Sequence, residues 1–220
     1  MSTQTAVRPH RALADLGPFA QVRAGQLGRR VPQLYLGLVL YGVSLAMMVR
    51  AGLGLAPWDV LHSGIAGLVP LTLGQVIVVL SFVVLLLWIP LREKPGIGTI
   101  SNALVVGFSA DVTMAVLSTP DALWLRTTLL VLGVVGNALA TALYIGSQFG
   151  RGPRDGLMTG LARRTGWSLR LVRTGLEITV VVLGLLLGGV LGVGTVLYAL
   201  AIGPLAQAML PAFTVDIDRP

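Results

Sequence analysis

Six long apolar stretches, separated by short polar segments, dominate the pattern of the chain. A helix that crosses the hydrocarbon core of a bilayer needs about 20 mostly apolar residues, and each stretch is close to that length. The pattern therefore predicts an all-α membrane protein with six transmembrane helices. The predicted spans are residues 31–49, 73–91, 96–117, 123–145, 169–188 and 192–210.

Two further segments, about 55–69 and 152–165, are too short and too polar to cross a bilayer comfortably. Each has a proline near its start and an aspartate two residues later. We expect two short helices, which either re-enter the membrane or lie at its interface. Residues 1–30 are polar and contain several arginines, so they predict a mobile cytoplasmic tail with a short interfacial helix near 13–23.

Composition agrees with a membrane protein. Hydrophobic residues make up 55% of the 220 residues and charged residues 11%, and the mean hydropathy is +0.84. A soluble domain carries about 25% charged residues. The net charge of +7 is explained by arginines that face the cytoplasm and meet anionic lipid. Because no aromatic–basic binding motif occurs, we expect the lipid bilayer as a partner and no nucleic acid.

The distribution of basic residues predicts the orientation. If the N-terminus is cytoplasmic and each long stretch crosses once, fourteen basic residues fall inside and only Arg50 and Arg126 fall outside. Both termini are then cytoplasmic, and the expected location is the bacterial inner membrane. The inside group consists of Arg8, Arg11, Arg23, Arg29, Arg30, Arg92, Lys94, Arg151, Arg154, Arg163, Arg164, Arg170, Arg173 and Arg219.

The residue types in the chain restrict its chemistry. There is no cysteine, so disulfides and thiolate catalysis are excluded, and His10 and His62 are the only histidines. No zinc-protease or serine-hydrolase motif occurs. We therefore predict no catalytic residues, no cofactor and no metal site, and we do not expect an enzyme.

An internal repeat appears when the sequence is shifted by 96 residues. Over positions 54–110 the shift gives nineteen identities in fifty-seven pairs, including a paired Pro-x-Asp and a paired Gly-x-Gly-Thr. Gly37 also falls on Gly133, which places the first helix in the repeat and argues against a cleaved signal peptide. The predicted repeats are 31–118 and 119–213, followed by a short C-terminal tail at 214–220.

Each repeat contains three predicted spans, which is an odd number. The second repeat must then enter the membrane from the opposite face. Such an inverted-topology duplication is common among secondary transporters. Duplicated bundles without a transport role also exist, so the repeat favours transport without establishing it.

The two Pro-x-Asp segments carry the candidate binding residues. An aspartate in the first turn of a helix faces the positive end of the helix dipole, and helix ends of this kind bind ions or substrate groups. Two interfacial helices with ordinary acidic caps would give the same pattern. Residues four apart share a helix face, and the candidates on these faces are Asp59, His62, Ser63, Asp155 and Thr159.

Three charged residues, Asp111, Arg173 and Glu177, lie well inside predicted spans, where a charge usually has a partner or a wet cavity. Arg173 and Glu177 are four apart on one helix and can pair; they are either a structural pair or part of a binding site. Asp111 is near the outer end of its helix, and we interpret it as reaching the interface.

The chain resembles a known family. The matching segments are Gly-Leu-Gly-Leu-Ala-Pro-Trp-Asp at 52–59, Gly-Ile-Gly-Thr at 96–99 and Gly-Val-Gly-Thr at 192–195. They are similar to the YczE/YyaS/YitT group of bacterial integral membrane proteins. The chain ends shortly after its last predicted helix, so the YczE-like branch is the better match. The resemblance implies a fold and a location, but no substrate and no set of binding residues.

Two functions follow from these patterns. The first is a transporter or channel for a small solute or ion, with a site between the two repeats. The second is a non-transporting scaffold or accessory protein that supports another membrane enzyme or a secretion step. The identity of the solute stays open, as does the choice between a homo-oligomer and another membrane protein as partner.

Overall fold

The computed structural model describes residues 17–217, and within that range every regular element is a helix. The six predicted spans appear as long helices whose ends lie within four residues of the expected positions. They are α2 (Leu27–Ala51), α4 (Leu73–Leu91), α5 (Ile97–Val116), α6 (Leu123–Gly146), α8 (Leu169–Leu186) and α9 (Val193–Phe213).

Three short helices complete the described chain. The two Pro-x-Asp segments form α3 (Pro57–Ala66) and α7 (Pro153–Thr165). The predicted interfacial helix is represented by α1 (Pro18–Arg23), while residues 13–16 lie outside the described range, as does most of the predicted tail. Of the predicted C-terminal tail, residues 218–220 are outside that range, and Val215 is held by a backbone hydrogen bond to Gly146.

Five of the long helices are long and apolar enough to cross a membrane: α2, α4, α5, α6 and α9. The remaining long helix, α8, has 18 residues and carries three charged ones, Arg170, Arg173 and Glu177. Charged residues in a span are costly and usually face a partner or a cavity. The composition of α8 thus sets it apart from the other five.

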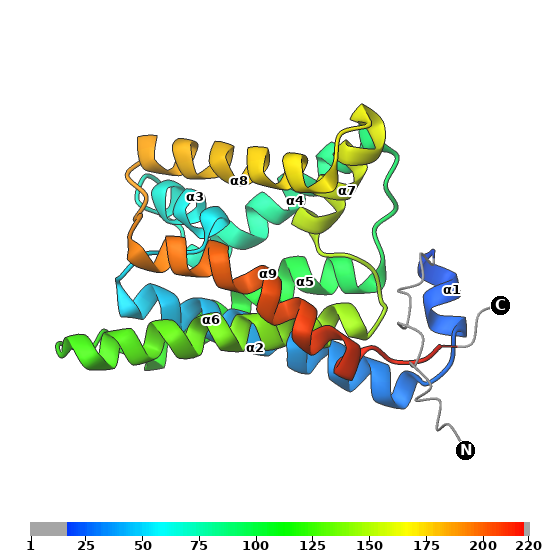
Figure 1. Cartoon of the computed structure of the whole chain (residues 1–220), viewed down its shortest axis with the longest axis horizontal. Helices are drawn as coiled ribbons and strands as arrows, with labels where there is room; N and C mark the ends of the chain where they lie inside the picture. The colour runs from blue at the N-terminus through cyan, green and yellow to red at the C-terminus, as the bar shows by residue number, and fades with distance from the viewer. Residues whose placement is uncertain (1–16, 218–220) are drawn as a thin grey trace, which may run out of the picture.

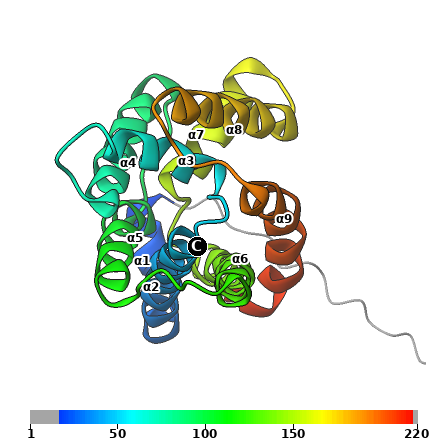
Figure 2. The ribbon, with the colours of Figure 1, turned by 90° about the vertical axis from the view of Figure 1, so that its left-hand side faces the viewer.

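The helices form two layers (Figures 1 and 2). The helices α2, α5, α6 and α9 make up one layer, and α3, α4, α7 and α8 lie above it. In the first layer α2 packs against α5 and α6, and α6 packs against α9. In the second layer α3 packs against α8 and α4 against α7, while α4 also packs along α5. By contrast, α8 and α9 barely touch.

Two irregular segments connect the layers. In each of them a glycine allows the backbone to come very close to the backbone of another segment. The segment before α3 runs past the start of α9, where Gly54 has φ +122° and abuts Gly192. The segment before α7 runs in the same way past the start of α5, where Gly150 has φ +104° and lies beside Gly96. A side chain at either position would be strained at this φ.

Backbone hydrogen bonds fix both segments. The N–H of Gly194 donates to the carbonyl oxygen of Leu53, and the N–H of Gly98 donates to that of Phe149, each at 2.8 Å. The first N–H groups of a helix lack partners within the helix, so each segment satisfies a donor at the start of a helix in the other half of the chain. These contacts place the N-termini of α3 and α7 in the interior of the protein.

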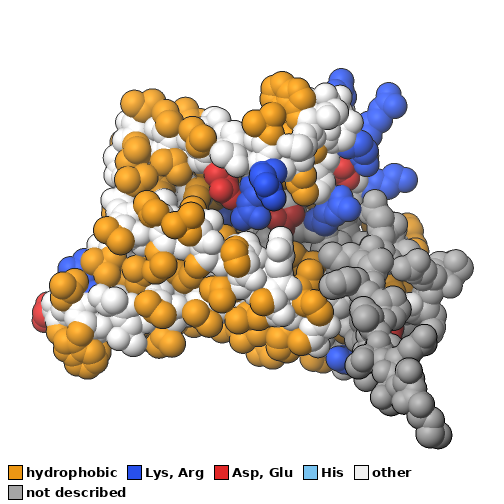
Figure 3. Space-filling model, in the orientation of Figure 1, with side chains coloured by type: hydrophobic (Ala, Val, Ile, Leu, Met, Phe, Trp, Pro, Cys, Tyr) orange, Lys and Arg blue, Asp and Glu red, His pale blue; other side chains and the backbone are white. Residues whose placement is uncertain are grey.

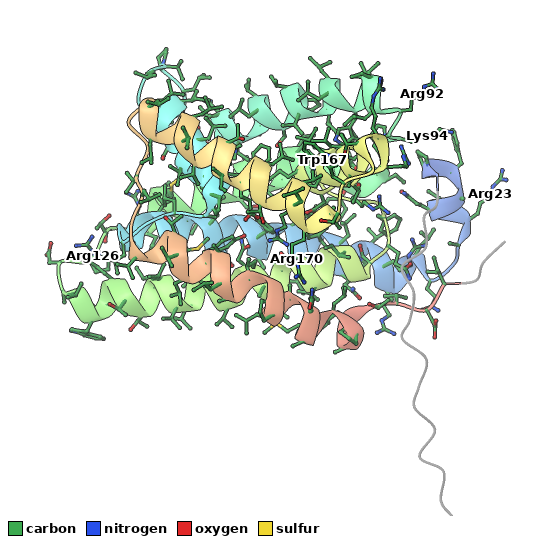
Figure 4. All side chains as sticks on the ribbon, turned by 45° about the horizontal axis from the view of Figure 1, so that its top comes forward. Arg23, Arg92, Lys94, Arg126, Trp167 and Arg170 are labelled. Atoms are coloured by element: carbon green, nitrogen blue, oxygen red, sulfur yellow. The ribbon has the colours of Figure 1, made fainter. Side chains whose placement is uncertain are left out.

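The outer surface is largely apolar, and basic residues gather at one end. Hydrophobic side chains are spread over the face in Figure 3. The exposed apolar side chains of the molecule include Phe108 of α5, which is 71% exposed. In Figure 4, Arg23, Arg92 and Lys94 lie at one end of the molecule and Arg126 lies at the other. Arg126 donates to the carbonyl oxygens of Ala51 and Gly52, at the end of α2.

Candidate functional site

A cavity of about 230 Å³ lies between the two layers. It is lined by residues of α2, α3, α4, α5, α6, α7, α8 and α9, with the N-termini of α3 and α7 among them. Its lining mixes aromatic, charged and small apolar side chains. The aromatic and charged members are Tyr41, Trp58, Tyr144, Arg154, Asp155, Arg173, Glu177 and Tyr198.

A second cavity, of about 340 Å³, adjoins the first. Lys94 and Arg151 line it, so it lies toward the end of the molecule where Lys94 is seen in Figure 4. Asp155 and Arg173 line both cavities, together with Ile145 and Met158. These four shared residues lie where the two cavities adjoin, and we call the first the inner cavity and the second the outer cavity.

Asp59 lies in the first turn of α3 and is almost fully buried, with 2% of its surface exposed. One of its carboxylate oxygens is 2.9 Å from Nδ1 of His62 and 3.5 Å from a guanidinium nitrogen of Arg154. Arg154 lines the inner cavity, whereas Asp59 and His62 are not part of its lining. The predicted pair on α3 therefore lies behind Arg154, where it can hold that guanidinium in place.

Asp155 occupies the corresponding position on α7 but has different surroundings. Its carboxylate accepts a hydrogen bond from the hydroxyl of Tyr144. Within the described range, no basic side chain lies within 4 Å of it. Asp155 thus faces both cavities without a salt bridge of its own, although Arg154 and Arg173 are close enough to interact with it electrostatically.

The two predicted hydroxyl residues have unequal positions. Thr159 lines the outer cavity and accepts a hydrogen bond from Arg151 at 3.0 Å. Ser63 instead donates to the carbonyl of Val60, and its oxygen is 3.4 Å from the N–H of Val190, in the link between α8 and α9. The structure brings Asp155 and Thr159 to a common cavity but gives Ser63 a place outside both.

Arg173 and Glu177 form the expected pair, with Nε of Arg173 at 2.9 Å from a carboxylate oxygen of Glu177. Both residues line the inner cavity from α8. Figure 3 shows charged side chains gathered in the gap between α8 and α9, within an otherwise apolar face. The inner cavity is therefore open on this side, where the two helices part.

Asp111 has a structural role at the start of α4. Its carboxylate accepts hydrogen bonds from the N–H of Gly74, at 2.9 Å, and from the hydroxyl of Thr72. Thr72 is the residue before the first helical residue of α4 and also accepts from the N–H of Gln75. Asp111 thus reinforces a helix cap and does not line either cavity.

Sequence reasoning missed four residues that line the inner cavity: Trp58, Tyr144, Arg154 and Tyr198. Arg154 was counted only as a cytoplasmic charge, yet its guanidinium lies inside the protein, 5.4 Å from the centre of the Trp58 ring. Tyr198 donates a hydrogen bond to Asn137 at 2.9 Å, and Tyr144 donates to Asp155. One signal was available, since Arg154 stands between the proline and the aspartate of its motif.

Comparisons with known proteins agree with this architecture. The chain is 40% identical over 177 residues to an uncharacterised protein of Haemophilus influenzae, covering 80% of this chain and 81% of that one. It is 32% identical over 180 residues to the uncharacterised membrane protein YczE of Bacillus subtilis, covering 80% and 83%. It is 27% identical over 185 residues to YyaS of the same organism, covering 80% and 90%.

The expected resemblance to YczE and YyaS is confirmed, and no solved structure matches the chain. Together with the five apolar helices, these relatives identify a multi-pass integral membrane protein. Residues 28–211 match a family whose description is a family of unknown function (DUF6198). The chain belongs to this family.

Proposed function

We propose that the protein is a transporter or channel that moves a small solute or ion across the bacterial inner membrane. The observation that carries this proposal is the inner cavity, which holds both members of an ion pair and an unpaired carboxylate between two layers of membrane helices. Charged groups within a span are costly and mark solute pathways or proton relays. The adjoining outer cavity gives this site a route toward one end of the protein.

An inverted repeat is the second part of the proposal, and contacts that recur at an offset of 96 residues support it. Gly54 abuts Gly192 just as Gly150 lies beside Gly96. A β-carbon at Gly37 would meet atoms of Ala140 and Tyr144, and one at Gly133 would meet Ser44 and Met48, which are the same positions with the halves exchanged. Such mutual exchange is what a twofold relation between two halves produces.

The proposed topology has six spans, with α8 as the sixth, and two re-entrant helices. Arg173 and Glu177 neutralise each other within α8, which lowers the cost of placing this helix in the bilayer. The helices α3 and α7 start in the interior, where protein shields their backbone from lipid, as re-entrant segments require. The end that carries Arg23, Arg92 and Lys94 faces the cytoplasm in this arrangement.

The scaffold hypothesis predicts a tightly packed interior without a route for solute. Two adjoining cavities of about 230 and 340 Å³ favour transport over that hypothesis. A scaffold would also have little use for a guanidinium and an unpaired carboxylate facing a common cavity. We therefore place transport first.

Flux measurements test the proposal. The purified protein is reconstituted in liposomes, and uptake is measured for pooled metabolites and inorganic ions under imposed gradients. We expect gradient-dependent flux of at least one solute, lost in Asp155→Asn and retained in Asp121→Asn, because Asp121 is exposed and lies in the link before α6. Absence of flux for every solute, or equal flux in Asp155→Asn and the unaltered protein, would argue against transport.

A further inference from the structure

The charges around the inner cavity do not balance. Arg154 is matched by Asp59 at 3.5 Å, and Arg173 by Glu177 at 2.9 Å. Asp155 is the third carboxylate and has no basic partner within 4 Å among the described residues. With His62 neutral, the charged residues that line the inner cavity, taken together with Asp59, carry a net charge of −1, from two arginines and three carboxylates. The outer cavity, which Asp155 also lines, adds Glu93, Lys94 and Arg151.

The unmatched carboxylate faces the cavity with acceptor capacity to spare. A carboxylate accepts up to about four hydrogen bonds, and among the described residues Asp155 accepts one, from Tyr144. Asp155 is only partly buried, and a carboxylate that lines a cavity without a salt bridge favours a cation, or a group that carries one, as its ligand. An anionic solute would instead add to the excess negative charge.

Aromatic side chains surround the same space. The rings of Tyr41 and Tyr144 meet edge to face, with centroids 6.3 Å apart, and Tyr198 and Trp58 also line the cavity. Ring faces attract ammonium groups and apolar stems alike. A compact inorganic ion would use little of this wall, and the described residues hold no group of three His, Cys, Asp or Glu side chains that suits a metal ion.

A second unsatisfied group indicates what else the ligand carries. Trp58 is 7% exposed, and its indole Nε1 has no hydrogen-bond partner among the described residues. A buried N–H without a partner costs about 1–3 kcal/mol. Because the Trp58 side chain lines the cavity, a ligand oxygen that reaches its enclosed Nε1 would remove that cost. The site therefore combines an acceptor for a cation with a donor that lacks an acceptor.

We propose that the inner cavity binds a small protonated organic amine that also carries an oxygen acceptor, with the ammonium group at Asp155 and the oxygen at Nε1 of Trp58. Arg154 and Arg173 stay paired with Asp59 and Glu177, so neither guanidinium is left without a carboxylate to attract a competing anion. This assignment rests on the proposed transport function, since it names the solute of the same site.

Binding is tested on the full chain in nanodiscs, by the shift in melting temperature on addition of small probes. Ligands that bind only the folded state raise this temperature. We expect a saturable rise with ethanolamine, a smaller rise with ethylamine, which lacks the oxygen, and none with ethylene glycol or glycolate. A rise with glycolate, or with sodium chloride alone and not with ethanolamine, would overturn the assignment to an amine.

Variants assign the binding to the two groups. Asp155→Asn should abolish the ethanolamine shift, and Asp121→Asn should retain it. Trp58→Phe keeps an aromatic ring but removes the N–H donor, so it should reduce the shift with ethanolamine to that with ethylamine. If Asp155→Asn does not fold, the Trp58→Phe result still decides, because an unchanged preference for ethanolamine contradicts the proposed geometry.

The two proposals fail in different ways. Ethanolamine binding without flux in liposomes would overturn transport and leave the ligand assignment intact. Flux of an anionic solute that depends on Arg154, in the absence of any amine binding, would overturn the ligand assignment and leave transport intact.

Discussion

The guanidinium of Arg154 lies 5.4 Å from the centre of the Trp58 ring, so the second residues of α7 and α3 stack on each other in the interior. These residues are 96 positions apart and occupy equivalent places in the two Pro-x-Asp motifs. In the proposed inverted repeat, such equivalent residues would meet near the axis that relates the two halves. The contact connects the start of α3 to the start of α7.

Replacing Arg154 should destabilise the fold as well as alter the cavity. In Arg154→Gln the buried carboxylate of Asp59 loses its basic partner and keeps only His62. We expect a loss of about 1–3 kcal/mol in the free energy of unfolding, the usual cost of leaving a buried polar group unsatisfied. Chemical unfolding in detergent micelles measures it. The exposed Arg151→Gln serves as control and should change the free energy by less than about 0.5 kcal/mol.

The glycines of the two connecting segments should not tolerate a side chain. In Gly54→Ala the β-carbon would meet backbone atoms of Gly192 at 2.9 Å, at φ +122°. In Gly150→Ala the closest atoms are 3.2 Å away, at φ +104°. We expect both variants to lower the melting temperature, Gly54→Ala more strongly. Gly175→Ala meets nothing within 4 Å and should be neutral or stabilising, because alanine favours a helix; an equal loss in all three would contradict the close contact.

Arg30 should be essential for the stability of the fold at the end of the molecule near α1. It is fully buried and donates to the carbonyl oxygens of Ser147 and Gln148 at 2.9 Å and to that of Gln21 at 2.7 Å, with its guanidinium over the Phe149 ring. Hydrogen bonds to a charged group contribute about 1.5–3 kcal/mol each.

Neither Arg30→Lys nor Arg30→Gln keeps the planar fork that reaches several carbonyls at once. We therefore expect a loss of more than about 3 kcal/mol in the free energy of unfolding for both variants. The neighbouring Arg29 is exposed, so Arg29→Gln should be close to neutral. Urea unfolding followed by tryptophan fluorescence compares the three variants, and a similar effect of Arg29→Gln would indicate a general effect of charge.

Access of water to α7 can be measured because the chain has no cysteine. A single cysteine at Thr159, which lines the outer cavity, should react with a water-soluble maleimide. A cysteine at Val60, which is 0% exposed, should not react in the folded protein. Labelling at Val60, or protection at Thr159, would contradict the cavity as described.

The same chemistry tests the orientation. Leu68 follows α3 and is 65% exposed, whereas Lys94 lies at the basic end of the molecule. In intact cells a membrane-impermeant maleimide should label a cysteine at Leu68 and should reach one at Lys94 only after lysis. The reverse result would place the basic end outside.

Helix positions were predictable because spans are encoded locally. A bilayer demands about 20 apolar residues in a row, and this requirement alone places α4 at Leu73–Leu91, as expected. Pro57 and Pro153 similarly mark the beginnings of α3 and α7, since proline is tolerated as the first residue of a helix. Such features depend on a residue and its near neighbours only.

The cavity was only partly predictable because it depends on contacts between distant segments. Arg154 and Arg163 are both arginines of one polar helix, yet one lies inside the protein and the other is largely exposed beside Glu93. The spacing of the motifs predicts the same helix position for Asp59 and Asp155. Their partners differ, however, because Asp59 is hydrogen-bonded to His62 and Asp155 to Tyr144. These neighbours in the tertiary structure determine the environment of each side chain in the site. Counting charged residues or measuring hydrophobic periodicity along the sequence does not reveal them.

The helices α4 and α5 pack closely against each other, whereas α8 and α9 barely touch. Gly74 and Gly107 let α4 and α5 approach backbone to backbone. The positions 96 residues later hold Arg170 and Gly203, and a β-carbon at Gly203 would meet nothing within 4 Å. In the first half of the chain the two helices are thus packed together, whereas in the second half α8 carries an exposed arginine at the position that corresponds to Gly74 and makes little contact with α9.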